Sequence, residues 1–418
     1  MPHRETIKTK LSNLIDASHG NAITHLTGLV RTLSDNPPGD CAPIARVAAA
    51  QLRQLGFEVE LHEVDPQTTA RAGMQSVINL VVRERFGDGS VIALNAHGDV
   101  VPPGLGWTVD PYKGEQRDGW LFGRGAAVSK SDFVTYAYAL RALKQSGARL
   151  KGTVELHFTF DEETGGLLGP GWLLEQGIVK PDYVICAAFS YNVIIAHNGC
   201  LHLEARVRGK SAHAAAPHTG HDAIEATSAL LNAFYRYRDS LKQIVSSTPG
   251  IASPTCVVGL IKGGINTNVV ADEVVLRIDR RIIPEESPAQ VEQDLRQVLA
   301  EALKDMPGIQ LEVDQILLAR PLAPTAASAA FAETLARNAQ DIMGEPIAAA
   351  MGIPLYTDAR LYSENGIPTI MYGAGPRDLL EANGHRADER VPLDTINKAA
   401  KVIAYTLLDM LDDSGAAR

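Results

Sequence analysis

The chain has 418 residues, of which 45% are apolar, and its formal net charge is −10 at pH 7. A chain of this length exceeds one typical core, so we expect about two or three domains. The acidic balance excludes a general nucleic-acid binder, because that function needs a basic surface that displaces counterions. No run approaches the ~18 consecutive apolar residues that cross a bilayer, so we expect no membrane partner either.

The four cysteines, Cys41, Cys186, Cys200 and Cys256, lie far apart and form no CxxC pair. Their spacing predicts neither a disulfide framework nor a thiolate zinc site. The first twenty residues contain no apolar segment and no small-residue cleavage site typical of a signal peptide. We therefore expect a protein of the reducing cytoplasm.

Strands and helices alternate in the first part of the chain. The pattern predicts helices over residues 42–55 and 132–143, and strands over residues 57–64, 91–97 and 152–160. This order predicts an α/β layer with a largely parallel sheet.

The pattern changes after Lys180, where strands become shorter or alternate cleanly between apolar and polar residues. Strands are predicted over residues 183–189, 193–197, 201–209 and 274–282, and long helices over residues 222–241 and 288–306. We interpret residues 199–314 as an inserted α+β domain whose sheet has one exposed face. Residues 1–198 and 315–418 then form the first, catalytic domain.

Two candidate site residues stand at the end of the predicted strand 91–97. His97 and Asp99 lie two residues apart in AHGDV, so both side chains project from the same side of an extended chain. A metal-ligating histidine usually has its second ring nitrogen held by a carboxylate, and Asp99 could do this. The alternative is a hydrogen-bonded loop pair, which this short motif alone does not exclude.

Three consecutive acids, Asp161, Glu162 and Glu163, follow the apolar strand 152–160 and precede a Gly-Gly turn. Ligands of open α/β sheets bind beyond the carboxyl ends of the strands. One glutamate could ligate a divalent ion while its neighbour takes a proton from water, the division of labour in metal-assisted hydrolysis. The alternative is a solvated acidic loop.

Four further polar residues are ordinary in isolation: His385 in NGHRADER, His213 in GKSAHAAAP, and Asn268 and Arg281 on either side of a predicted strand. The glycine-rich segment GRGAAVSKSD at residues 123–132 lacks the GxxxxGK[ST] spacing of a phosphate-binding loop.

Taken together, these motifs form an ordered set. HGD, GRG followed by Lys130, DEETGG, GKSAH, NVVADE with DRR, TDAR and HRADE resemble the aminoacylase, acetylornithine deacetylase and carboxypeptidase G family of metallopeptidases. The resemblance extends from about Val30 to the C-terminus. It implies a two-lobed fold, in which a catalytic α/β domain binds two zinc-like ions and a small inserted lid domain forms a dimer. We therefore expect a homodimer or higher homo-oligomer.

The resemblance also implies roles for single residues at the metal site. His97, Glu163 and His385 correspond to metal ligands, Asp99 to the residue that orients His97, and Glu162 to the general base. For the substrate, His213 corresponds to a histidine that reaches across the dimer.

Contacts to a substrate carboxylate correspond to Asn268, Arg281 and Arg360 of TDAR. A planar guanidinium suits a carboxylate.

Two positions depart from the family pattern. Val128 stands where an aspartate bridges both ions, and Ala187 stands where the family has another metal-binding carboxylate, with no acid anywhere between Asp182 and Glu204. Two cations a few ångströms apart repel, and a bridging carboxylate offsets this repulsion. We therefore expect one weakly held divalent ion, Mn²⁺ or Zn²⁺, with the substrate supplying a missing ligand. Asp132 is either a substitute ligand or a helix cap.

These observations predict a metal-dependent hydrolase of a C–N bond, an amide or an aryl amine, in a small carboxylate-bearing substrate such as the aminobenzoate nitroanthranilate. Two alternatives remain open. One is a catalytically silent relative that binds a carboxylate ligand, and the other is an ordinary dinuclear aminoacylase, deacetylase or dipeptidase.

Overall fold

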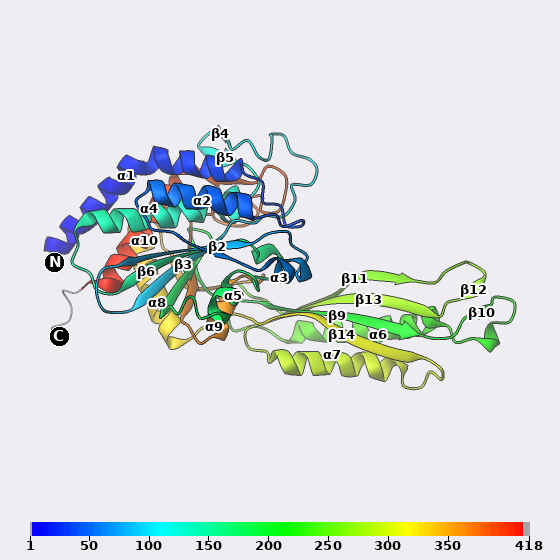
Figure 1. Ribbon diagram of the computed structural model, residues 1–418. Coiled ribbons are helices and arrows are strands. Elements are labelled where there is room, and N and C mark those ends of the chain that lie inside the picture. The colour runs from blue at the N-terminus through cyan, green and yellow to red at the C-terminus, as the bar shows by residue number, and fades with distance from the viewer. Residues whose placement is uncertain (1, 413–418) are drawn as a thin grey trace. The chain divides into compact units, whose positions relative to one another are not determined.

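The computed structural model describes residues 2–412 (Figure 1). The chain divides into two compact units, of which the second comprises Ala196–Ala323 and Gly352–Tyr356 and the first comprises the rest of the described chain. The domain boundary predicted at residue 314 falls inside strand β14 (Gln310–Ala319). All of β14 belongs to the second unit, because its backbone pairs with strand β9 (Gly199–Arg208) of that unit.

The main sheet has eight strands in the order β1-β2-β6-β3-β7-β16-β8-β15. Their bounds are β1 Glu60–Glu63, β2 Ile78–Arg85, β3 Val91–His97, β6 Thr153–Thr159, β7 Tyr183–Cys186, β8 Asn192–His197, β15 Ala348–Ile353 and β16 Thr369–Met371. The four strands β6, β3, β7 and β16 are parallel, whereas β1, β2 and β8 pair antiparallel with their neighbours. The α/β class is thus confirmed, but the sheet is mixed rather than largely parallel.

Long helices pack around this sheet and share one apolar core with it. They are α1 (Pro2–Val30), α2 (Ala42–Gln54), α4 (Ser131–Ser146), α8 (Ala326–Met343) and α10 (Leu393–Leu411). Shorter elements are α3 (Pro66–Arg71), α5 (Pro170–Glu175) and α9 (Ala359–Glu364), with a small sheet of β4 (Glu115–Arg117), β5 (Trp120–Phe122) and β17 (Arg390–Pro392). No helix within residues 2–412 is long and apolar enough to cross a membrane.

The second unit is a four-stranded antiparallel sheet in the order β11-β13-β9-β14. Its other strands are β11 (Thr255–Gly263) and β13 (Glu273–Ile282), and helices α6 (Ala223–Ser240) and α7 (Pro288–Leu303) lie along one face of the sheet (Figure 1). Side chains alternate along β9, so that Leu201, Leu203, Ala205 and Val207 pack into the core with the helices. The residues between them lie on the opposite, more polar face. A two-residue ribbon of β10 (Ala212–His213) and β12 (Val269–Val270) completes the unit.

The parallel centre of the first sheet explains where polar motifs gather. β3 ends at His97, and its neighbour β6 ends at Thr159, two residues before Asp161, the first acid of the DEETGG motif. Since the carboxyl ends of parallel strands meet at one edge of a sheet, the HGD and DEETGG motifs come together there.

Candidate metal and catalytic site

His97 is buried at the end of β3, and its ring contacts Asp99 through Nδ1. The Nδ1 atom of His97 lies 3.1 Å from the backbone oxygen of Asp99 and 3.4 Å from its carboxylate Oδ1. The other ring nitrogen, Nε2, lies 4.0 Å from Oε2 of Glu162. Asp99 therefore fixes the ring so that Nε2 faces the acidic segment.

The fully buried carboxylate of Asp99 also organises the acidic turn. It accepts the backbone N–H groups of Glu162 and Glu163, each at 3.1 Å. The side-chain amide of Asn36 donates to Asp99 Oδ2 at 3.0 Å. One carboxylate thus sets the position of His97 and of both glutamates. Asn36 has no motif in its neighbourhood that would have marked it in the sequence.

The glutamates lie on a short 3₁₀ turn, Glu162–Thr164, and their side chains meet His97. One candidate ligand atom from each of His97, Glu162 and Glu163 lies within 4.8 Å of the others. Nε2 of His385 lies 3.2 Å from Oε1 of Glu163. The structure therefore brings together all four predicted metal and base residues, and this set of imidazole and carboxylate donors fits a divalent ion.

The charges of this cluster depend on one another. Burial raises the pKa of Glu162 to about 8, and the negative charge of Glu163 acts in the same direction while protonated His97 opposes it. Burial lowers the pKa of His97, but Glu162 and Asp99 outweigh that effect and raise it well above its usual value. The hydrogen bond to Glu163 raises the pKa of His385. The acidic side chains of this cluster thus favour the protonated forms of His97 and His385.

The two departures from the family pattern both lie at this site. The backbone N–H groups of Ala127 and Val128 donate to Oε1 of Glu389, each at 3.1 Å, and Arg124 pairs with Glu389 at 2.6 Å. The side chain of Val128 lies next to Gly384, which precedes His385.

Ala187 follows β7, where its N–H donates to the oxygen of Asn95 on β3 at 2.8 Å. Both missing carboxylates would therefore have been close to the ligands that remain.

Asp132 does not cap helix α4. The N-cap residue of α4 is Lys130, and Asp132 instead accepts the N–H of Ala374 at 2.7 Å. Its other oxygen is buried without a hydrogen-bond partner among residues 2–412. Burial raises the pKa of Asp132 well above its usual range. Its role as a substitute ligand stays a prediction.

Arg360 already contacts groups of the protein itself. Its guanidinium is buried and donates to the backbone oxygen of Gly165 at 2.7 Å and to Glu364 at 3.1 Å. Because Gly165 ends the turn that carries the two glutamates, Arg360 holds this turn in place. Its role towards a substrate carboxylate stays a prediction.

The neighbouring residue Asp358 of the TDAR motif is buried close to Glu162. Burial and the charge of Glu162 raise its pKa well above the usual range. Burial and the nearby Asp358 likewise raise the pKa of Asp161. The TDAR motif contains Asp358, but only the fold shows that this residue lies close to Glu162.

The remaining predicted substrate residues belong to the second unit. His213 is exposed on β10, and the oxygen of Asn268 accepts the N–H of Ala214 at 3.0 Å, so the two residues lie on adjacent segments. Strand β13 begins at Glu273, and Arg281 lies near its other end, about 26 Å along the strand. The guanidinium of Arg281 donates to both oxygens of Asp279, at 2.9 and 3.1 Å. The roles of these three residues towards a substrate stay predictions.

A model described as "Peptidase family M20/M25/M40" matches residues 93–409. The chain belongs to this family. The resemblance to the aminoacylase, acetylornithine deacetylase and carboxypeptidase G family is thereby confirmed, and the M20 family consists of metal-dependent hydrolases. One M20 relative, an acetylornithine deacetylase of Vibrio campbellii (strain ATCC BAA-1116), is 33% identical over 277 residues, which cover 65% of this chain and 69% of that protein.

Solved M20 structures share the fold. The aminopeptidase PepT from Bacillus cereus ATCC 10987 is 23% identical with a TM-score of 0.73, over 94% of this chain and 98% of that chain. A dinuclear metal-binding M20 peptidase from Bacillus subtilis is 17% identical with a TM-score of 0.69, over 95% of this chain and 99% of that chain. At these identities the comparison concerns the fold alone.

Asp99→Asn is expected to weaken metal binding by roughly 10- to 100-fold, the usual cost of losing a group that orients a ligand. An amide nitrogen cannot accept a hydrogen bond, so one of the backbone N–H groups of Glu162 and Glu163 loses its partner. Calorimetric titration with Zn²⁺ measures the change. Asp88→Asn, at an exposed carboxylate, is the matched control, and equal affinities of both variants would contradict the role of Asp99.

Proposed function

We propose that this M20 protein hydrolyses a C–N bond, an amide or an aryl amine, in a small carboxylate-bearing substrate, using a single weakly held Mn²⁺ or Zn²⁺. The observation that carries the proposal is the donor set itself. His97, Glu163 and His385 converge beside Glu162, while apolar side chains occupy positions 128 and 187. Such a set suits one ion with open positions better than a bridged pair.

The chain's own residues supply the steps around the ion. A bound divalent ion would polarise the carbonyl of a scissile amide and, for either type of bond, lower the pKa of water in the site. Glu162 takes the proton of the attacking water and delivers it to the leaving nitrogen, as a general base and then a general acid. Asp99 keeps the imidazole of His97 and the Glu162 backbone in register for this transfer.

A substrate carboxylate or amine has a second task in this proposal, because it fills a coordination position that Val128 and Ala187 leave open. An amide beside a carboxylate, as in an N-acyl amino acid, offers both groups. An aminobenzoate such as nitroanthranilate offers an ortho amine and carboxylate that chelate together. The V. campbellii relative, named for acetylornithine, supports the first of these classes.

A substrate panel tests the proposal. N-acyl amino acids, ureido acids and aminobenzoates are incubated with the protein and added Mn²⁺ or Zn²⁺, and release of amine or ammonia is measured. We expect turnover of at least one class that stops on addition of a chelator. Binding of carboxylates without turnover of any compound would favour a catalytically silent relative.

We also propose that the protein forms a homodimer through the second unit. β11 is an edge strand of the four-stranded sheet and exposes apolar side chains, with Val257 53%, Leu260 60% and Ile261 60% accessible. An exposed apolar edge favours pairing with a second copy. Sedimentation should show a dimer for the wild type and a monomer for Leu260→Lys. The exposed Leu105→Lys in the first unit is the control, and a dimeric Leu260→Lys would count against this surface.

The reducing cytoplasm is our proposed location. Its support is that Cys41, Cys186, Cys200 and Cys256 are all buried and none forms a disulfide. Disulfides are rare in compartments where thiols are kept reduced.

A further inference from the structure

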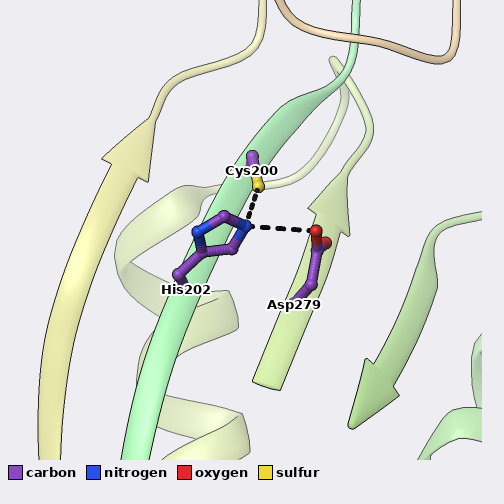
Figure 2. Close-up of side chains that lie close together, drawn as sticks. All are labelled: Cys200, His202 and Asp279. Atoms are coloured by element: carbon purple, nitrogen blue, oxygen red, sulfur yellow. Dashed lines mark hydrogen bonds and ion pairs between the residues drawn. The ribbon is translucent and has the colours of Figure 1, made fainter. Parts of the chain in front are cut away.

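A second cluster of metal-type side chains lies on the sheet of the second unit, among residues that the proposed hydrolysis does not use as ligands. Cys200 and His202 are two residues apart on β9 and therefore project from the same face. The antiparallel register places Asp279 of β13 directly opposite His202. Figure 2 shows the three side chains converging above the strands. This face is the one turned away from the apolar core shared with α6 and α7.

Both short contacts within this cluster involve the same atom, Nε2 of His202. Nε2 of His202 lies 3.1 Å from Sγ of Cys200 and 3.1 Å from Oδ2 of Asp279 (Figure 2). A single N–H group at Nε2 can point well at only one of these two acceptors. If Nε2 carries no proton, its lone pair instead faces the carboxylate oxygen. No single proton position serves both contacts well, whereas a cation placed between the three atoms would.

We propose that Cys200, His202 and Asp279 form a binding site for a zinc-type divalent ion. In a tetrahedral zinc site, bond lengths of about 2.3 Å to sulfur and about 2.0 Å to nitrogen or oxygen separate the ligands by roughly 3.3 to 3.5 Å. The ligand atoms here are a few tenths of an ångström closer, so small side-chain shifts create the site.

The donor types favour zinc over magnesium, calcium or manganese. A thiolate and an imidazole are preferred by zinc, whereas the harder ions take oxygen ligands. Binding exchanges the thiol proton of Cys200 for the ion, so uptake releases a proton to solvent. The thiolate and the Asp279 carboxylate then balance the charge of a divalent ion.

Arg281 forms hydrogen bonds to one of the three proposed ligand residues, Asp279. It stands opposite Cys200 in the strand register, and its guanidinium donates to both oxygens of Asp279 at 2.9 and 3.1 Å. Ligating carboxylates are commonly oriented by such hydrogen bonds. The side chains of His202 and Asp279 are 35% and 23% exposed, so the ion has a path from solvent and water can take the fourth position.

Sequence spacing alone did not reveal this site. The absence of a CxxC pair argued against a thiolate zinc site, but here one cysteine combines with a histidine on its own strand and a carboxylate from the next strand. The third ligand is 79 residues away from Cys200 in the chain and becomes a neighbour only through β9–β13 pairing.

Cobalt(II) distinguishes the Cys200, His202 and Asp279 site from the site around His97, because only the former has a sulfur ligand. The full-length protein is titrated with Co²⁺ in a non-thiol reducing buffer, and the sulfur-to-cobalt charge-transfer band in the near ultraviolet is recorded. We expect one equivalent of Co²⁺ to produce the band and Zn²⁺ to abolish it by displacement. The band should persist in Glu163→Gln, because this substitution alters only the site around His97.

Two variants and a control decide the assignment. Cys200→Ser and His202→Gln should each abolish the band and weaken Zn²⁺ binding at this site more than the roughly 10- to 100-fold loss that removal of an outer contact causes. Cys256→Ala, at a buried cysteine of the neighbouring strand β11, should keep the band. His202→Gln decides alone if Cys200→Ser does not fold, because its side chain is partly exposed. Absence of the band in the wild type, or its persistence in either site variant, would overturn the proposal.

Discussion

Val128→Asp combined with Ala187→Glu is expected to tighten metal binding by at least about 100-fold, about 2.7 kcal/mol in binding free energy. The two substitutions return carboxylates to the positions where family members carry them, next to Gly384, which precedes His385, and directly after β7. A carboxylate between two cations offsets their repulsion, so the variant should also take up a second ion. Calorimetric titration with Zn²⁺, made with His202→Gln present so that the cluster on the second unit does not contribute, gives both affinity and stoichiometry.

The control for this variant separates charge from size. Val128→Asn with Ala187→Gln introduces side chains of the same shape without negative charge, and should leave affinity close to that of the wild type. Equal Zn²⁺ affinities of the acid and amide variants would show that these positions do not reach the ion.

Glu162→Gln is expected to lower turnover by at least about 100-fold, because a positioned general base contributes typically 10²- to 10⁴-fold. The amide keeps the shape of the glutamate and its backbone N–H bond to Asp99 but cannot accept the proton of water. Metal uptake should stay nearly unchanged. Initial rates on the best compound of the substrate panel, together with metal titration, measure the two effects separately.

The neighbouring Glu163→Gln provides the matched comparison. Glu163 contacts His385 and is a predicted ligand, so its substitution should weaken metal uptake and lower turnover through the loss of the ion. If Glu162→Gln instead loses the metal while turnover at saturating metal is unaffected, Glu162 is a ligand and the assignment of the base is wrong.

The core of the site could be predicted because its residues follow directly on strands. His97 ends β3, and Glu162 and Glu163 follow β6, so a parallel pairing was enough to bring them together. His385 lies in a loop, and only the ordered set of motifs marked it. The ordered motifs also made the departures at Val128 and Ala187 detectable, because they show at which positions the family has a carboxylate.

Other features depend on contacts that no local pattern records. The acidic turn is held by Asn36 and by buried Arg360, and both contacts join segments more than 100 residues apart. A guanidinium that suits a substrate carboxylate suits a backbone oxygen and a glutamate equally, so residue type alone could not decide the role of Arg360. The sheet is mixed because β2, which the sequence pattern did not predict, pairs antiparallel with both of its neighbours, and because β8 pairs antiparallel with β16.

The number of metal ions per chain, measured by elemental analysis after dialysis against Zn²⁺ or Mn²⁺ with and without a turned-over substrate, tests the central claim most directly. The measurement uses His202→Gln, so that the cluster on the second unit does not contribute. We predict substoichiometric metal without substrate and one ion per chain when the substrate carboxylate is present. Two tightly held ions per chain without substrate, or no ion under either condition, would contradict the account.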